Sequence, residues 1–312
     1  MGDEGAAIKA QIKAQAFAVG FHKVGIAAPE VGMAAAHLRR WLRLGYHADL
    51  AWMANPKRQD LHRVLPGIQS VICVALNYYT PHVHAPDRPR ISRYGWGRDY
   101  HRVLGKRLKQ LCAWLNQRFP DSTNRYYVDT GPIPEKALAQ QAGLGWIGKN
   151  GNVISREYGS WVFLGEILTT VALPPDDPHP DRCGSCTRCL TACPTQAIVS
   201  PYVVDANRCL AYHTIENRAE VLPPAIAQHL ERWVAGCDIC QEVCPWNQRF
   251  AQPTEIPDFQ PYPANLHATF ADLCALSEAD WQRQFQGSAL RRIKPEALRR
   301  NAIAAFRSFR ER

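Results

Sequence analysis

The pattern that most constrains this chain is a run of cysteines in its second half. Residues 183–194 read CGSCTRCLTACP, which spaces four cysteines as Cys-x2-Cys-x2-Cys-x3-Cys and places a proline after the last. This spacing is typical of bacterial ferredoxins, in which the motif occurs twice and each copy lends its last cysteine to the other iron–sulfur cluster. Residues 237–245, CDICQEVCP, keep only the last three cysteines, and Val234 stands where the first would be.

The segment between the two motifs supplies an eighth thiol, Cys209. Two [4Fe–4S] clusters with four ligands each need eight thiolates. In ferredoxins the last cysteine of each motif binds the other cluster, and this crossover predicts how the eight thiolates divide. The first predicted set is Cys183, Cys186, Cys189 and Cys244, and the second is Cys193, Cys209, Cys237 and Cys240. Zinc, which also binds Cys-x2-Cys pairs, is the alternative. The other cysteines, Cys73, Cys112 and Cys274, lie in apolar patterns and are expected to pack rather than bind metal.

The chain has 312 residues, more than one hydrophobic core usually serves, so two or three domains are expected. We predict an α+β fold whose first domain, of α/β type, covers residues 1–175. A ferredoxin-like domain with both clusters is inserted at residues 176–250, after the proline-rich segment LPPDDPHPDR. A short, basic, helical segment covers residues 251–312.

Periodicity and turn residues predict the elements of the first domain. Strands are expected at residues 20–27, 70–79 and 124–134, the last running into a turn. Helices are expected at residues 1–20, 97–119 and 134–143, the second ending at Pro120. Residues 152–170 predict a hairpin that turns at Tyr158–Gly159. The glycine-rich segment GLGWIGKNGN, residues 143–152, is either a set of plain turns or a loop whose backbone approaches a large ligand.

Several protein classes are disfavoured. The first domain has no G-x-G-x-x-G after a strand, so a classical dinucleotide site is unsupported. No apolar run approaches the ~20 residues that span a bilayer, and the N-terminus does not resemble a secretory signal. We therefore expect a cytoplasmic protein without membrane attachment, whose thiols are reduced.

Positive charge is concentrated in two stretches of a chain whose formal net charge is +9. Residues 88–109 carry eight Lys or Arg against Asp99 alone, and residues 287–312 carry eight against two Glu. The first stretch also contains Tyr94, Trp96, Tyr100 and His101. Basic and aromatic side chains together favour a phosphate-rich partner such as a nucleic acid. The alternative for the tail is a packed helix with solvated arginines, in which Ile293, Leu298, Ala302, Phe306 and Phe309 face the core.

Three long segments carry a resemblance to a known family. They are NPKRQDLHRVLPGIQSVICVALNY (55–78), RYGWGRDYHRVLGKRL (93–108) and YVDTGPIPEKALAQQAGLGWIGKNGNVIS (127–155), followed by the eight cysteines. Together they resemble the epoxyqueuosine reductases over nearly the whole chain. The resemblance implies a cobalamin cofactor held by the first domain, two [4Fe–4S] clusters, and the last step of queuosine synthesis, in which an epoxide on a modified tRNA base becomes an alkene. Many members continue into a longer helical C-terminus.

The resemblance also implies site residues. Asp129, at the end of the 124–129 strand, matches the proton donor of the family, and its alternative is a turn carboxylate that bonds nearby amides. Removing an epoxide oxygen takes two electrons and two protons, and the leaving oxygen needs an acid. Polar residues are expected to ring the cobalamin, and the candidates are Arg58, Ser92, Tyr100, Asp129, Asn152, Cys237 and Asp238.

The expected partners are a tRNA carrying epoxyqueuosine and an external low-potential electron donor, and the chain is expected to be a monomer. Two other functions stay open. The corrinoid part is similar to that of reductive dehalogenases, so one alternative is a corrinoid-dependent reductase of a small molecule. The other is a non-catalytic iron–sulfur module on nucleic acid.

Overall fold

In the computed structural model, which describes residues 2–311, a four-stranded sheet organises the first half of the chain. Its order is β1 (Lys23–Ala27), β2 (Ser70–Asn77), β7 (Val162–Thr169) and β4 (Asn124–Tyr127), and every neighbouring pair is antiparallel. Strand β2 is buried along its whole length, which explains its continuous run of apolar residues. The mixed α+β class is confirmed, but the α/β-type description of the first domain is wrong, because no two neighbouring strands of this sheet are parallel.

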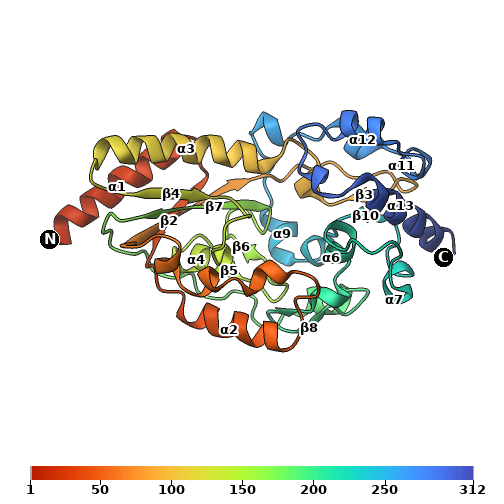
Figure 1. Ribbon diagram of the computed structural model, residues 1–312, viewed down its shortest axis with the longest axis horizontal. Helices are drawn as coiled ribbons and strands as arrows, with labels where there is room; N and C mark the ends of the chain where they lie inside the picture. Colours follow the sequence, from red (N-terminus) through yellow and green to blue (C-terminus); the bar gives the residue numbers. More distant parts are fainter. Residues whose placement is uncertain (1, 312) are drawn as a thin grey trace.

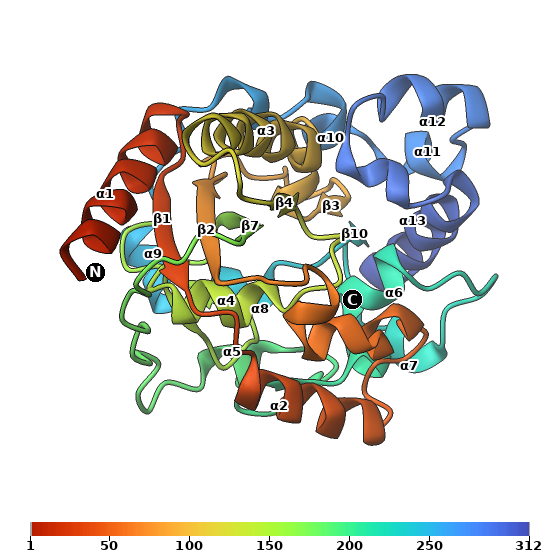
Figure 2. The ribbon, with the colours of Figure 1, turned by 60° about the vertical axis from the view of Figure 1, so that its left-hand side comes forward.

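Helices cover both faces of the sheet (Figures 1 and 2). Helices α1 (Gly2–Ala18) and α3 (Tyr100–Arg118) pack on one face, and α2 (Gly32–Arg43) and α4 (Glu135–Gln141) lie on the other. Alternate residues of β2 serve the two faces: Ile72 and Val74 pack under α1 and α3, whereas Val71 and Cys73 pack against the α2 and α4 side. The expected strands and the expected helices in this region are therefore confirmed, with small shifts of their ends.

The predicted hairpin at residues 152–170 is wrong. Its turn exists, since Ser155 and Gly159 form an isolated bridge, but its two arms pair with different strands. Strand β6 (Val153–Ile154) pairs with β5 (Trp146–Ile147), while β7 enters the centre of the main sheet. Gly159, at φ +62°, lies so close to Asn247 that an added Cβ would sit 2.1 Å from the Asn247 Oδ1. The turn is thus held against the cysteine-rich region, and this contact directs the two arms apart.

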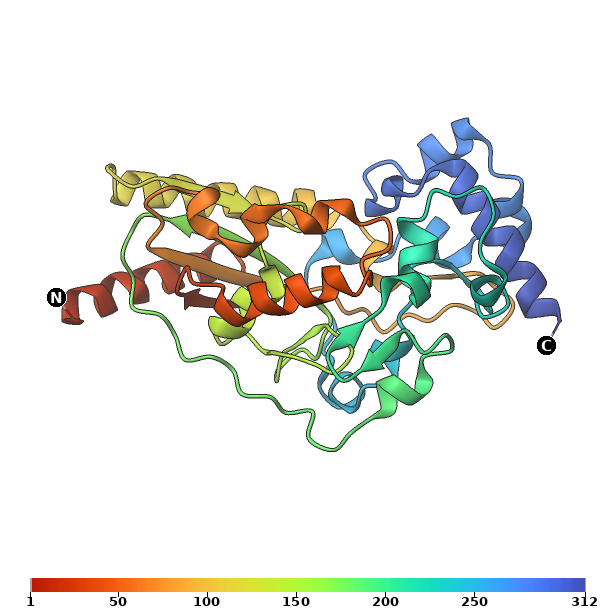
Figure 3. The ribbon, with the colours of Figure 1, turned by 60° about the horizontal axis from the view of Figure 1, so that its bottom comes forward.

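The cysteine-rich region is built from short elements. They are α5 (Arg188–Ala192), β8 (Ile198–Ser200), β9 (Val203–Val204), α6 (Leu210–Ile215), α7 (Pro224–Ala227), β10 (Trp233–Ala235), α8 (Ile239–Glu242) and α9 (Pro245–Phe250). The proline-rich segment that precedes them runs along the edge of the molecule (Figure 3). It is fixed by Asp176, whose carboxylate accepts hydrogen bonds from Lys9, Lys13 and the backbone N–H of Ile26.

A second core joins residues from all three predicted regions. Strand β3 (Arg90–Ile91) leaves the first half of the chain and pairs in parallel with β10. Ile91 and Trp96 pack there with Trp233 and with the C-terminal helices. These helices are α10 (Pro263–His267), α11 (Phe270–Cys274), α12 (Glu278–Gln284) and α13 (Pro295–Arg310). Short 3-10 helices occupy Ala51–Ala54, Pro56–Gln59, Leu61–Arg63, Arg93–Gly95, Ala206–Arg208, Pro257–Phe259 and Ala289–Arg292.

Helix α13 packs through the face that its apolar residues predict. Ile293, Leu298 and Ala302 are at most 1% exposed, whereas Phe306 and Phe309 are each 37% exposed. Within residues 2–311, no helix has the length and apolarity that a membrane crossing requires.

Two arginines of the tail make structural contacts. Arg299 donates to the carbonyl of Leu276, and the guanidinium of Arg300 donates to the carbonyls of His213, Asn217 and Ala219. Both therefore favour the packed-tail alternative over a surface that is free to bind phosphate.

This arrangement predicts that Arg300→Gln destabilises the fold. The shorter side chain loses several charge-assisted hydrogen bonds, so the free energy of unfolding should fall by roughly 1.5–3 kcal/mol. Denaturant unfolding of the parent and the variant measures it. Arg310→Gln, in the same helix but fully exposed, is the control and should change the stability by less than about 0.5 kcal/mol. Equal stabilities of the Arg300 variant and the parent would contradict the structural role.

Candidate functional site

Asp129 lies where β4 ends and the chain turns toward α4. Its backbone is in the left-handed region, at φ +56°, which aspartate tolerates better than most residues. Its N–H donates to the carboxylate of Glu135, in the first turn of α4, and this bond helps to hold the unusual backbone. The Asp129 side chain is 53% exposed, so its carboxylate is accessible to a reactant.

Asp129 is paired with a histidine from the start of α3. The Nε2 of His101 lies 3.4 Å from Asp129 Oδ2, and its Nδ1 lies 2.7 Å from the Oδ1 of Asp99, the N-cap residue of the helix. Burial alone would lower the pKa of His101, but the two carboxylates outweigh it and raise the pKa to about 9. Burial acts in the opposite direction on Asp129 and would raise its pKa, but hydrogen bonding to His101 and Tyr100 lowers it. At neutral pH the pair therefore holds its proton on His101.

Two further carboxyl groups lie beneath this pair. Burial raises the pKa of Glu135 to about 7, and the charge of Asp129 adds to the effect. Glu166, in the middle of β7, is fully buried, and neither of its oxygens has a hydrogen bond of ordinary geometry. Burial and the neighbouring Glu135 raise the pKa of Glu166 well above its usual value. The buried environment of Glu166 therefore favours its neutral form.

Cations complete the surroundings of Asp129. Arg58 donates to the carbonyl of Ile133 at 2.9 Å, and burial lowers its pKa while Glu135 and Asp129 oppose this. Lys136 donates to the carbonyl of Gly151 at 2.7 Å and lies 3.4 Å from the Oδ1 of Asn152. Burial lowers the pKa of Lys136, and the thiols of Cys240 and Cys209 counteract it together with the nearby carboxylates. Lys136 thus connects the surroundings of Asp129 with the cysteine-rich region.

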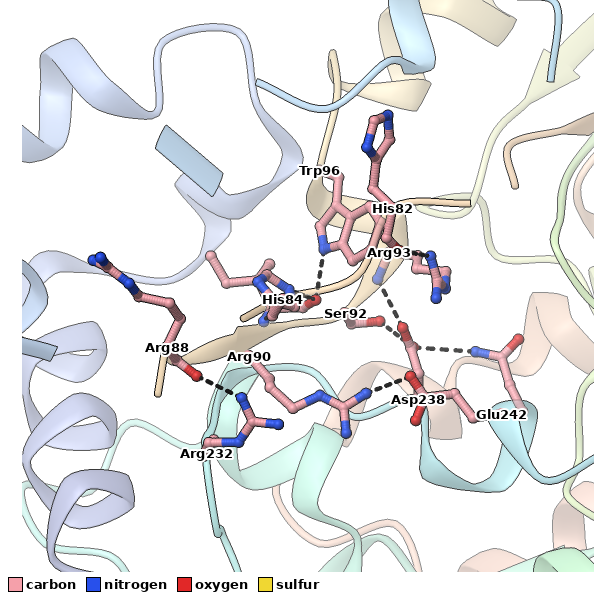
Figure 4. Close-up of polar contacts among 12 residues, drawn as sticks. His82, His84, Arg88, Arg90, Ser92, Arg93, Trp96, Arg232, Asp238 and Glu242 are labelled. Atoms are coloured by element: carbon pink, nitrogen blue, oxygen red, sulfur yellow. Dashed lines mark hydrogen bonds and ion pairs between the residues drawn. The ribbon is translucent and has the colours of Figure 1, made fainter. Parts of the chain in front are cut away.

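Ser92 and Asp238, two of the expected cofactor contacts, bond to each other (Figure 4). Ser92 Oγ donates to Asp238 Oδ1 at 2.5 Å, and the N–H of Arg93 donates to Oδ2 at 2.8 Å. Both side chains are buried, at 4% and 1% exposure, and burial raises the pKa of Asp238 to about 6. Asp238 is also the N-cap residue of α8, so this contact fixes the backbone next to Cys237. The Ser92 and Asp238 side chains therefore stabilise the backbone of the site.

The causes of the cysteine pKa shifts relate thiols within each predicted set and, for Cys189 and Cys240, also thiols of different sets. In the first set, burial raises the pKa of Cys189, and the nearby thiols of Cys183 and Cys244 raise it further. Burial also raises the pKa of Cys244, with a contribution from Cys186.

In the second set, burial raises the pKa values of Cys209, Cys237 and Cys240. Cys193 adds to the effect at Cys209 and Cys240, and Cys209 adds to it at Cys237. All eleven cysteines of the chain are free thiols, and Cys73 and Cys112 pack in the cores around the sheet. Among residues 2–311, no three His, Cys, Asp or Glu side chains are placed to hold a single metal ion.

The glycine-rich loop of residues 143–152 holds the cysteine loops in place. The Nζ of Lys149 donates to the carbonyls of Gly184 at 2.6 Å and Cys186 at 2.9 Å. The side-chain amide of Asn150 donates to the carbonyl of Cys240 at 3.3 Å. One loop of the first half of the chain therefore contacts the backbone of both cysteine groups.

Several site residues were missed from the sequence. His101 was noted only as part of a basic and aromatic stretch, while Glu135, Lys136 and Glu166 were not singled out. The E-K pair that follows Pro134, and a glutamate inside the apolar strand VFLGEILT, were the available signals. A charged residue in the middle of a buried strand is costly, which makes it a candidate for a function.

The buried state of Glu166 predicts an unusual dependence of stability on pH. Its pKa is raised in the folded state, so the parent protein loses stability as pH rises above about 4.3, where an unfolded glutamate ionises. Glu166→Gln removes this loss. The stability of the Glu166→Gln variant relative to the parent should increase by about 1.4 kcal/mol per pH unit, until the pH reaches the pKa of Glu166 in the folded parent.

Chemical denaturation at several pH values measures this difference. Glu157→Gln is the control with the opposite sign, because Lys23 and Ser155 outweigh burial and lower the pKa of Glu157. A constant stability difference between the Glu166 variant and the parent from pH 4 to pH 8 would show that Glu166 is ionised in the folded protein.

Comparison with known proteins gives a consistent result. The family model described as epoxyqueuosine reductase QueG, DUF1730, matches residues 58–130, and the model of a 4Fe-4S double cluster binding domain matches residues 182–247. The chain is 66% identical to an epoxyqueuosine reductase from Synechocystis sp. over 87% of this chain and 94% of the relative. It is 55% identical to that of Gloeobacter violaceus over 95% of each.

A solved structure supports the same relationship at the level of the fold. An epoxyqueuosine reductase crystallised with a tRNA-Tyr epoxyqueuosine-modified stem loop is similar at a TM-score of 0.91 and 31% identity, over 98% of this chain and 82% of that one. The chain described above belongs to the epoxyqueuosine reductase family.

Proposed function

We propose that this protein reduces epoxyqueuosine in tRNA to queuosine. The observation that carries the proposal is an accessible Asp129–His101 pair beside Lys136, which donates to the carbonyl of Gly151. Lys149 and Asn150 of the same loop bond to the backbone of the cysteine motifs, and this favours one site shared by the proton donor and the thiols. Relatives that are 52–66% identical are epoxyqueuosine reductases, and this favours the proposal over reduction of a small molecule or a non-catalytic role.

The thiols fit two [4Fe–4S] clusters, because the two motifs and Cys209 supply the eight thiolates that two clusters need, and the model of a 4Fe-4S double cluster binding domain matches residues 182–247. We assign Cys183, Cys186, Cys189 and Cys244 to one cluster, and Cys193, Cys209, Cys237 and Cys240 to the other.

The site also fits cobalamin in its chemistry. Arg58, Tyr100 and Asn152 offer guanidinium, hydroxyl and amide groups to the amide-edged corrin ring, and Ser92 and Asp238 fix the backbone next to Cys237. When bound, the corrinoid supplies the electron pair for the epoxide carbon, and the clusters supply its electrons at low potential.

The chain itself supplies the proton. The epoxide oxygen leaves as an alkoxide unless it is protonated, and His101 holds a proton 3.4 Å from Asp129 at neutral pH. We assign the transfer to the pair: the Asp129 carboxylate contacts the oxygen and passes to it the proton that His101 holds. A second proton converts the same oxygen into water, which leaves, so the reduction uses two electrons and two protons in total.

The rim of the site has features that suit a nucleotide. Trp52 is 45% exposed, and the guanidinium of Arg292 lies 5.6 Å from the centre of its ring. Arg292 is paired with Glu216 and is close enough to Asp129 to affect its pKa. An exposed ring can stack on a base and a nearby guanidinium can bind phosphate. Cytoplasmic location, a monomeric state and an external electron donor remain predictions.

Anaerobic reconstitution with iron, sulfide and cobalamin, followed by an assay on epoxyqueuosine-containing tRNA, tests the function. Asp129→Asn should retain the bound cofactors and lose on the order of 10²–10⁴ in turnover, the usual contribution of a positioned acid. The parent should lose activity as pH rises through about 9, where His101 releases its proton.

Histidine NMR titration separates this assignment from a structural effect. Because Asp129 helps to raise the pKa of His101, that pKa should fall in Asp129→Asn, while Asp181→Asn, a change near the first cysteine group, should leave it unchanged. Full turnover by a loaded Asp129→Asn enzyme would remove Asp129 from the reaction. Absence of product from the loaded parent would reject the proposed function.

A separate prediction concerns Cys209, the ligand that lies outside both motifs. Cys209→Ala should lose the second cluster and retain the first, so iron per chain should fall by about half. Metal analysis and electron paramagnetic resonance of the reduced protein measure this. Cys274→Ala, which changes a thiol packed against the second core, is the control. An unchanged iron content in the Cys209 variant would exclude Cys209 as a ligand.

A further inference from the structure

Trp146 is fully buried, yet its indole N–H has no hydrogen-bond partner. A buried N–H without an acceptor is unfavourable, and in a native protein it points to a group that the protein binds. Trp146 lies on β5, directly after the glycines that start the 143–152 loop. The ring is fixed by its neighbours: Trp246 packs edge-on at 4.8 Å between ring centres, and the His179 ring lies at 5.1 Å.

The surroundings of this N–H are thiols of the first cysteine group. Trp146 forms a small apolar cluster with Ile154 and Cys244, against which Cys183 and Trp246 pack. Burial raises the pKa of Cys183, and the indole N–H of Trp146 is close enough to oppose the rise by hydrogen bonding. Two predicted cluster ligands, Cys183 and Cys244, therefore lie in the apolar cluster that contains this N–H. Trp246 differs, because its own N–H donates to the carbonyl of Arg182 at 3.3 Å.

We propose that Trp146 donates a hydrogen bond to the Cys183 sulfur of the first cluster and thereby raises the reduction potential of that cluster. Reduction adds a negative charge that spreads onto the ligating sulfurs, so a donor to sulfur binds the reduced state more strongly. Trp146 is a positioning residue in this proposal and has no contact with the substrate.

A second feature acts in the same direction. Lys149 is only 9% exposed, and its ammonium donates to the carbonyls of Gly184 and Cys186, within the loop that carries the first group. A positive charge held beside a cluster also stabilises its reduced form. The structure therefore stabilises an electron on the first cluster, where it is held until a second arrives for the two-electron reaction.

The inference rests on the proposed cluster ligands, and its test needs neither cobalamin nor tRNA. Trp146→Phe keeps most of the buried ring and removes the N–H. In a potentiometric titration followed by electron paramagnetic resonance, the midpoint potential of one cluster should become more negative, and that of the other should not move. Trp246→Phe is the matched control: it removes an N–H from the same apolar cluster, but one that is bonded to a carbonyl. It should leave both potentials unchanged.

Two results would overturn the inference. One is an unchanged pair of potentials in a Trp146→Phe protein with the iron content of the parent. The other is an equal shift in Trp246→Phe, which would indicate altered packing or solvent access.

If Trp146→Phe fails to assemble its clusters, the parent protein with ¹⁵N-labelled tryptophan provides the test. The reduced first cluster should then show a magnetic coupling to an indole nitrogen that is absent from Trp146→Phe or from unlabelled protein. No such coupling in the labelled parent would equally reject the proposal. Turnover of epoxyqueuosine with unshifted potentials would reject the inference and leave the proposed function intact.

Discussion

The site depends on a small set of polar contacts that hold the cysteine loops to the sheet. Lys149 and Asn150 bond to carbonyls of the two cysteine groups, and the Ser92–Asp238 bond fixes the start of α8 beside Cys237. These contacts are buried or partly buried, where a hydrogen bond is costly to lose. They join two regions that lie far apart in the sequence.

The charges around Asp129 follow from the same arrangement. Four carboxyl groups, Asp99, Asp129, Glu135 and Glu166, lie close together, and not all of them can be ionised in a poorly solvated place. His101 bonds to the two nearest the surface, while burial favours the neutral form of Glu166 in the sheet.

The sequence predicted the elements with strong periodicity and the cysteines with fixed spacing. Strand β2 and helix α3 were predictable because their apolar patterns are long. Cys209 was predicted as a ligand because two clusters need eight thiolates and the two motifs contain only seven. The path of residues 152–170 was not predictable, because the side chain that separates its arms, Asn247, lies almost 90 residues away. The pairing of β3 with β10 was missed for the same reason: two-residue strands are defined by their partners.

The arginines of the tail show how charge in a sequence differs from charge on a surface. Eight cations against two acids in residues 287–312 suggested phosphate binding. In the structure, Arg299 and Arg300 bind backbone carbonyls and Arg292 binds Glu216, because guanidinium groups satisfy the carbonyl ends of short loops well. A count of residue types does not distinguish these bonded arginines from arginines that are free to bind phosphate. Arg292, in the 3-10 helix that precedes α13, also lies near Asp129 and the exposed Trp52, so this helix is the part of the described tail that we propose to contact the substrate.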